Sequence, residues 1–184
     1  RLPAFRAAHP EVQLRLISQD AGFDARRDAI DVLIHYGTAP FDGARCLATL
    51  PDVVFPVAAP RLSGLDKPLE QLPLIGCEWL EPSWLSWRRW AQLAGQAPLQ
   101  KANALRFTQY TDAVYAAVGG EGVALGWQSL IGPHLNDGRL VRLGNLEVVP
   151  EERHSLLVPT TRTQNRGARK LTQWLVEAFG AQQA

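Results

Sequence analysis

Residues 107–127 read FTQYTDAVYAAVGGEGVALGW, which predicts a short helix, a glycine stop and a buried strand in direct succession. Thr108 can cap the start of the helix, and Asp112 lies in or near its first turn, where the helix dipole favours negative charge. The glycines that follow end the helix, and the apolar run VALGW is short enough for a strand. A helix start leaves backbone N–H groups unpaired, so a cleft beside it would bind a small anion. This pattern favours a protein that senses or carries a small molecule over one that transforms it.

Helical and strand patterns alternate along the rest of the chain. Helices are predicted over 2–9, 128–136 and 165–179, the last with Asn165 as its N-cap and Gly180 after its end. Within 83–94, Trp84, Trp87 and Trp90 lie at spacings of three, which puts them on one helix flank or around a packed turn. Strands are predicted over 12–18, 30–34, 45–50, 53–59, 72–77, 104–108, 139–143 and 153–158. Such alternation favours an α/β architecture with largely parallel sheets.

The composition is that of an ordinary globular protein. The 184 residues carry a net charge of +1, so no charge excess indicates nucleic acid or membrane lipid as a partner. No apolar run reaches the roughly 18–20 residues of a membrane helix, and no secretory signal is present. Cys46 and Cys77 suggest no disulfide framework, so we expect free thiols in a reducing cytoplasm. The absence of Met leads us to expect a fragment of a longer protein, and the preference for Arg over Lys indicates a GC-rich bacterial genome.

A search for catalytic motifs gives little. The four histidines lack the spacings of a metal site, and no GxSxG, phosphate loop or GxGxxG is present. We therefore expect no enzyme activity, no metal and no cofactor. Catalytic groups converge in space rather than in sequence, so the absence of motifs is only weak evidence against enzyme activity.

Several segments, taken in order, resemble the effector-binding domain of LysR-type transcriptional regulators. They are RLPAF at 1–5 with His9-Pro10, IDVLI at 30–34 with Tyr36-Gly37, VFPVAAP at 54–60, Trp87 and Trp90, 107–125 with its GEGVAL, GRLV at 138–141 and the terminal helix with Trp174-Leu175. The subgroup they resemble most is that of the glycine-cleavage activator and the β-lactamase regulator. No single segment is specific to this family, but the ordered series of segments is.

The resemblance implies two α/β lobes joined by two crossover strands, a type 2 periplasmic-binding-protein-like fold. The first lobe would hold residues 1–58 and 157–184, and the second residues 59–156. A small effector would bind between the lobes. In the family an extra strand and loop precede the RLPAF-type helix, so the first strand of lobe I is expected to be missing here. The winged helix-turn-helix is missing as well, so this fragment should not bind DNA by itself, and DNA binding would belong to the absent N-terminal domain.

The resemblance also suggests ligand-binding residues, each of which has a plainer structural interpretation. Thr108, Gln109 and Tyr110 would face the cleft or simply start a helix, and Tyr36, Gly37 and Thr38 would end a strand there or form a surface turn. Gly76, Cys77, Trp127 and His154 would line the cleft or be packed, and a redox role for Cys77 is the weaker alternative. Trp79, Trp84, Trp87 and Trp90 are expected in packing rather than in ligand stacking. Arg106 would favour a carboxylate ligand unless it is solvated or paired with an acid.

Family domains usually form homodimers or tetramers, which predicts a dimer interface on the first helix and the strand after it. The residues expected there are Leu2, Phe5, Val12, Leu14 and Leu16. Two other classes remain open: a solute-binding protein of a transporter, which shares the two-lobed fold, and an enzyme on a related scaffold.

Overall fold

The computed structural model describes residues 2–18, 29–78, 84–97, 99 and 105–181, and these form two compact units. Unit 1 holds residues 1–51 and 151–184, and unit 2 holds residues 52–150. The boundaries expected from the resemblance lie after residues 58 and 156, whereas the compact units divide at 51/52 and 150/151. The strand Val54–Ala58, which lies between the two, pairs with described strands of unit 2. In the described part of the chain, no helix has both the length and the apolar character needed to cross a membrane.

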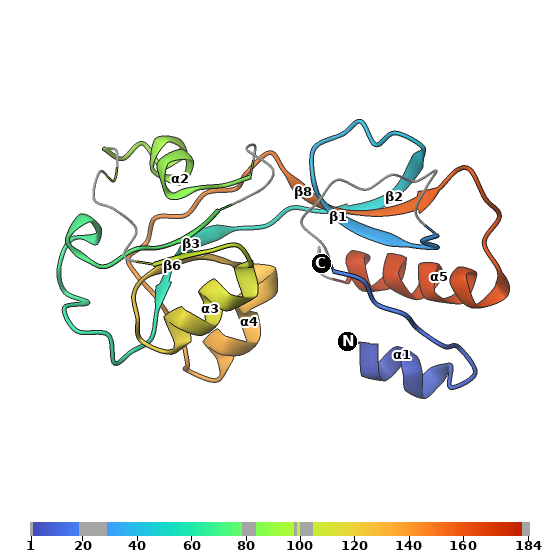
Figure 1. Cartoon of the computed structure of the whole chain (residues 1–184), viewed down its shortest axis with the longest axis horizontal. Helices are drawn as coiled ribbons and strands as arrows, with labels where there is room; N and C mark the ends of the chain where they lie inside the picture. The colour runs from blue at the N-terminus through green and yellow to red at the C-terminus, as the bar shows by residue number, and fades with distance from the viewer. Residues whose placement is uncertain (1, 19–28, 79–83, 98, 100–104, 182–184) are drawn as a thin grey trace. The chain divides into compact units, whose positions relative to one another are not determined.

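Unit 1 is an antiparallel sheet covered by a long helix (Figure 1). Its sheet has the order β1 (Leu33–Gly37), β8 (Arg153–Pro159), β2 (Ala44–Leu50). Helix α5 (Arg166–Gly180) follows β8, and its Asn165 N-cap accepts a hydrogen bond from the backbone N–H of Ala168 at 2.9 Å, as predicted. Gly180 is the last helical residue rather than the first one after the helix.

Helix α1 (Leu2–Ala8) attaches to unit 1 through Phe5, which is fully buried. The Phe5 ring lies 5.5 Å from the ring of Trp174 in α5 and 5.0 Å from that of His9. Phe5 was expected at a dimer interface. In the single chain its side chain packs within unit 1 and has no exposed surface.

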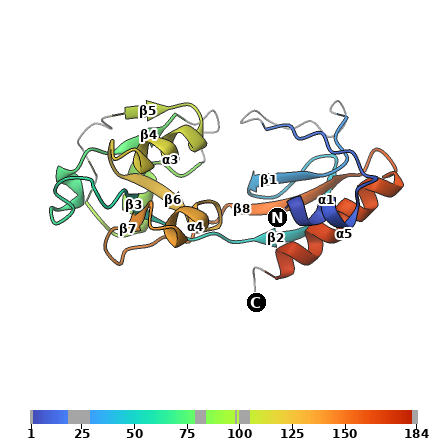
Figure 2. The ribbon, with the colours of Figure 1, turned by 90° about the horizontal axis from the view of Figure 1, so that it is seen from below.

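Unit 2 contains two small sheets, and a hydrophobic core is formed by side chains of its strands and helices. The three-stranded antiparallel sheet has the order β6 (Ala124–Trp127), β3 (Val54–Ala58), β7 (Val141–Arg142), and β4 (Ile75–Cys77) pairs in parallel with β5 (Leu105–Phe107). The helical elements are η1 (Leu69–Gln71), α2 (Trp87–Leu93), α3 (Tyr110–Val118) and α4 (Gln128–Asn136). Figure 2 shows α3 beside β4 and β6, and apolar side chains of α3, including Val114 and Ala117, pack there against Ile75.

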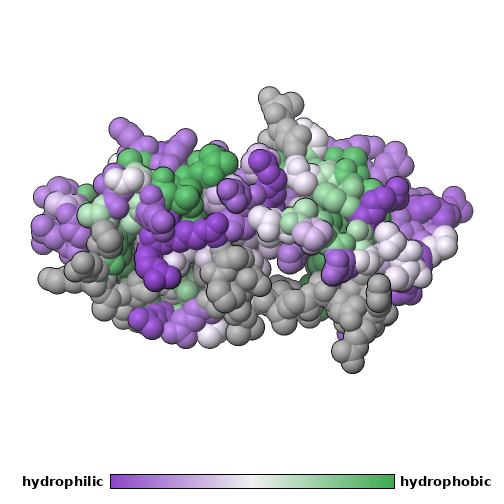
Figure 3. Space-filling view, turned by 90° about the horizontal axis from the view of Figure 1, so that it is seen from above, coloured by the Kyte–Doolittle hydropathy of each residue, from purple (hydrophilic) through white to green (hydrophobic). Residues whose placement is uncertain are grey.

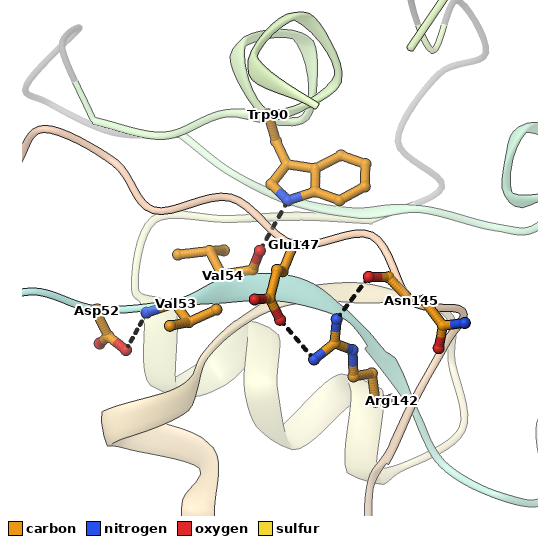
Figure 4. A network of polar contacts seen from close by, with 7 residues as sticks. All are labelled: Asp52, Val53, Val54, Trp90, Arg142, Asn145 and Glu147. Atoms are coloured by element: carbon orange, nitrogen blue, oxygen red, sulfur yellow. Dashed lines mark hydrogen bonds and ion pairs between the residues drawn. The ribbon is translucent and has the colours of Figure 1, made fainter. Parts of the chain in front are cut away.

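Two tryptophans of α2 are packed rather than available for ligand stacking. The indole N–H of Trp90 donates to the carbonyl of Val54 at 3.0 Å (Figure 4), and that of Trp87 donates to the carbonyl of Ile75 at 2.8 Å. Both side chains are buried, so they fasten α2 to β3 and β4. Trp84 is partly buried, and Trp79 lies outside the described residues.

The prediction of largely parallel sheets is wrong, because the chain crosses between the units twice. It leaves unit 1 after β2 and returns at β8, and the register pairs Leu50, the last residue of β2, with His154 at the start of β8. Strands that leave and re-enter a unit at the same place run in opposite directions. In unit 2 the same relation holds between Val54 and Val148, which form an antiparallel bridge.

Two predicted strands of unit 1 also differ. Residues 12–18 belong to no strand, since none of the described strands lies hydrogen-bonded beside them. The strand expected over 30–34 begins at Leu33, because the carbonyl of Asp31 accepts a hydrogen bond from the Gln164 side chain at 3.0 Å instead of joining the sheet.

Candidate functional site

The start of α3 presents two polar side chains to solvent. Thr108 and Gln109 are exposed, and both follow β5 directly. The N-cap is Gln109 rather than Thr108, and its side chain makes no capping hydrogen bond. The predicted cap at Thr108 is therefore wrong by one residue. Asp112 lies in the first turn, as expected. The first turn of α3 therefore contains one carboxylate, that of Asp112, and backbone N–H groups that the Gln109 side chain does not cap.

Tyr110 points the other way, into unit 2. Its hydroxyl accepts a hydrogen bond from the backbone N–H of Trp127 at 3.1 Å and donates to the carbonyl of Leu125 at 3.4 Å. The two rings meet edge to face at 4.9 Å. Burial raises the pKa of Tyr110 above its usual value, so the phenol stays protonated. Tyr110 therefore fixes the start of α3 to the end of β6.

Four of the predicted site residues meet around one small cavity of about 40 Å³ in unit 2. Gly76 and Cys77 come from β4, Tyr110 from α3 and Trp127 from β6, and Trp87 also lines the cavity. Such a volume holds about one water molecule. These residues form the support under the α3 start, and the cavity is too small to enclose an effector.

The remaining predicted residues lie in unit 1. Tyr36 of β1 stands opposite His154 of β8 in the sheet register, and their rings lie 4.9 Å apart. Gly37 is buried, and a Cβ there would lie 2.7 Å from Nε2 of His35. Thr38 is exposed directly after the strand. The structure therefore sorts the candidate residues into two groups, one in each unit.

Arg106 has a protein partner. Its guanidinium lies 3.4 Å from the carboxylate of Glu78, and both side chains are more than half exposed. Of the two interpretations of Arg106, the described geometry fits pairing with an acid. An exposed pair of this kind contributes little stability, so a ligand carboxylate could replace Glu78 at small cost.

Sequence reasoning missed Asp52, a buried carboxylate at the first residue of unit 2. It accepts hydrogen bonds from the backbone N–H of Val53 at 2.9 Å (Figure 4) and from that of Ser129 at 3.1 Å, and from the Ser129 hydroxyl. Asp52 thereby satisfies an N–H in the first turn of α4 and ties that helix to the chain crossing. Ser129 is 77 residues further along the chain, so no local pattern signals the contact.

In the described part of the chain, no group of three or more His, Cys, Asp or Glu side chains could hold a metal ion. Cys46 is exposed and Cys77 is partly buried, and both are free thiols.

A family model described as the LysR substrate binding domain matches residues 1–180. The chain belongs to this family. This LysR domain is 32% identical over 190 residues to the HTH-type transcriptional regulator TrpI of Pseudomonas aeruginosa, covering 96% of the chain and 61% of that relative. It is 25% identical to the glycine cleavage system transcriptional activator of Escherichia coli, covering the whole chain and again 61% of the relative. The LysR domain therefore spans about three fifths of the length of these curated relatives.

The solved structures agree on the fold of the LysR domain. The effector domain of the transcriptional regulator AmpR of Pseudomonas aeruginosa superposes with a TM-score of 0.79 at 24% identity, covering 99% of this chain and 88% of that chain. The regulatory domain of CrgA, a LysR-type regulator of Neisseria meningitidis, superposes with a TM-score of 0.77 at 19% identity, covering 97% of this chain and 90% of that chain. The expected two-lobed, type 2 periplasmic-binding-protein-like fold is confirmed.

Proposed function

We propose that this LysR domain is the effector-sensing part of a bacterial transcription regulator. It binds a small molecule and passes the signal to an N-terminal winged helix-turn-helix, through which the longer protein binds DNA in the cytoplasm as a homodimer or tetramer. The observation that carries the proposal is the family match over residues 1–180. The relatives named above are transcriptional regulators, which favours this role over the solute-binding protein of a transporter and over an enzyme.

The α3 start is the proposed effector contact in unit 2. Thr108 and Gln109 expose hydroxyl and amide groups, which hydrogen-bond neutral and charged ligands alike. Gly76, Cys77, Tyr110 and Trp127 are proposed to act beneath them, by holding this turn in place. In a site of this kind, binding geometry depends on supporting residues whose rotamers are fixed by packing.

In unit 1 the proposed contacts are Tyr36, Gly37, Thr38 and His154. The Tyr36 and His154 rings already pack on each other, so they present one preformed surface.

The first turn of α3 limits the charge of the effector. Its N–H groups attract an anion, but the exposed Asp112 carboxylate in the same turn repels one. A ligand that carries both a carboxylate and an ammonium group, such as an amino acid or a cell-wall peptide, satisfies both. We therefore propose a zwitterionic effector ahead of a simple dicarboxylate.

Signalling requires that the effector bind one conformation of the domain more tightly than another. The difference in affinity sets the largest shift of the equilibrium that the effector can cause, and the coupling to DNA binding is reciprocal. Operator DNA should therefore change the affinity of the full-length protein for its effector by the same factor.

A thermal-shift screen against amino acids, small carboxylates and cell-wall peptides tests the proposal. A ligand that binds the native state raises the melting temperature by mass action. The shift should be lost in Gln109→Ala and kept in Gln92→Ala, which changes the same exposed residue type in α2. A shift that survives Gln109→Ala and Thr108→Ala would place the effector elsewhere.

A further inference from the structure

The outer face of the small parallel sheet of unit 2 carries a charged side chain next to the start of α3. Side chains alternate between the two faces of a strand, and Leu105 and Phe107 of β5 pack against the core of unit 2. Arg106 lies between them, so its side chain points away from that core and is 61% exposed. The same alternation, continued by one residue, puts the exposed Thr108 on the face of Arg106.

Backbone hydrogen bonds fix the position of the acidic partner of Arg106. β4 and β5 lie side by side (Figure 2) and run parallel. Cys77 stands opposite Phe107 in the register, and the backbone N–H of Glu78 donates to the carbonyl of Phe107 at 2.8 Å. Glu78 thus continues the pairing by one residue beyond β4. The backbone of the sheet therefore brings the two charged side chains together.

The contact between these two charges is loose. Nη1 of Arg106 lies 3.4 Å from Oε1 of Glu78. By comparison, the exposed Arg139–Asp137 pair of the same unit meets at 2.9 Å. Hydrophilic side chains cover much of the face drawn in Figure 3, so exposure alone does not distinguish the Arg106–Glu78 pair, but its place beside Thr108 does. An exposed pair contributes little stability, so each member can exchange its partner for a charged group of a ligand.

The charges around the start of α3 have both signs. Besides the pair, the exposed carboxylate of Asp112 lies in the first turn of the helix. A dicarboxylate or a phosphate monoester would face two carboxylates, those of Glu78 and Asp112, and a simple amine would face the guanidinium of Arg106. A ligand whose carboxylate and ammonium groups are held on one carbon atom matches both members of the pair.

We propose that Arg106 and Glu78 recognise the two charges of an α-amino acid effector. This inference rests on the proposed effector contacts at Thr108 and Gln109. The ligand carboxylate replaces Glu78 on the guanidinium, which donates two parallel hydrogen bonds to a carboxylate. The ligand ammonium group binds the carboxylate of Glu78 that this exchange releases. A ligand that lacks either group leaves one member of the pair without a partner, so the exchange favours a zwitterion over each single ion.

NMR titrations of the ¹⁵N-labelled domain with matched compounds test this assignment. Each set contains an amino acid, the acid that lacks its ammonium group and the amine that lacks its carboxylate. The sets are alanine, propionate and ethylamine; valine, isovalerate and isobutylamine; and phenylalanine, hydrocinnamate and phenethylamine. The amide shifts of Thr108 and Gln109 give the dissociation constants. In at least one set, the amino acid should bind about fivefold more tightly than either single ion.

Two variants separate the members of the pair. Glu78→Gln should lower the preference for the amino acid over the acid about fivefold, without lowering its preference over the amine. Arg106→Gln should lower the preference over the amine by a similar factor, without lowering the preference over the acid. Asp137→Asn is the matched control, because it removes a charge from the exposed pair with Arg139 in the same unit and should leave both preferences unchanged.

Three outcomes overturn the proposal. Loss of both preferences in Glu78→Gln means that this residue only supports the local structure, and unchanged preferences in both variants mean that the pair does not contact the ligand. If none of the three amino acids shifts Thr108 or Gln109 while another compound of the thermal-shift screen does, the assignment of an amino acid fails and the effector-sensing role stands. If no compound shifts these amides, the proposed effector contacts fail with it.

Discussion

The hydroxyl of Tyr110 lies 3.1 Å from the backbone nitrogen of Trp127, and this contact joins the first turn of α3 to the last residue of β6. Tyr110 is consequently a support for the proposed effector contacts Thr108 and Gln109, which precede it. Two solvent-exposed residues and one core-facing residue thus occupy three consecutive positions at the start of α3.

Tyr110→Phe should reduce the free energy of unfolding by about 1–3 kcal/mol, because the buried N–H of Trp127 loses its acceptor while the ring packing remains. Urea denaturation measures the change. Tyr115→Phe is the matched control, since Tyr115 is 59% exposed, and it should change stability by less than about 0.5 kcal/mol. Equal effects of the two substitutions would show that the Tyr110 hydroxyl contributes no stability.

The same phenol predicts a loss of stability in alkali. Its pKa is higher in the folded than in the unfolded chain, so its contribution is complete below the unfolded pKa of about 10 and is lost as the pH rises above it. The free energy of unfolding should fall by up to about 1.4 kcal/mol per pH unit more steeply in the parent than in Tyr110→Phe. Identical slopes above pH 10 would contradict the assigned burial of Tyr110.

Gly122, between α3 and β6, lies against the backbone of Pro73, two residues before β4. A Cβ there would lie 2.5 Å from the carbonyl oxygen of Pro73, so Gly122→Ala should destabilise unit 2 by about 1–3 kcal/mol. Gly132→Ala is the control, because nothing lies within 4 Å of its Cβ in α4. It should stabilise the protein by about 0.5–1 kcal/mol. Thermal unfolding of both variants gives the comparison.

Asp52→Ala should cost about 1–3 kcal/mol, because it leaves the N–H of Ser129 at the α4 start without its acceptor. Asp137→Ala provides the control, since that carboxylate is exposed and pairs with the nearby, exposed Arg139 at 2.9 Å. Its effect should stay below about 0.5 kcal/mol. Urea midpoints at neutral pH distinguish the two, and equal midpoints would remove the anchoring role of Asp52.

The elements that could be predicted are those whose signals are local. The prediction of 128–136 as a helix matches α4, and the Asn165 cap with its amphipathic stripe marks the start of α5 correctly. Segment 12–18 has the alternation of a strand but forms none among the described elements, because a strand requires a hydrogen-bonding neighbour as well as a pattern.

Long-range relations were not predictable from the sequence. The antiparallel pairing of β2 with β8 depends on where the chain re-enters unit 1, about a hundred residues after it left. The burial of Tyr110 depends on Trp127, and the role of Asp52 depends on Ser129. In each case the deciding partner lies too far along the chain for any periodicity to reveal it.

The most direct test of the central claim is an amide chemical-shift titration of the ¹⁵N-labelled domain with the compound that gives the largest thermal shift. The account predicts saturable shifts at Thr108, Gln109 and the first turn of α3. Saturable shifts confined to residues of unit 1 such as Leu14 and Leu171, with none at α3, would contradict it.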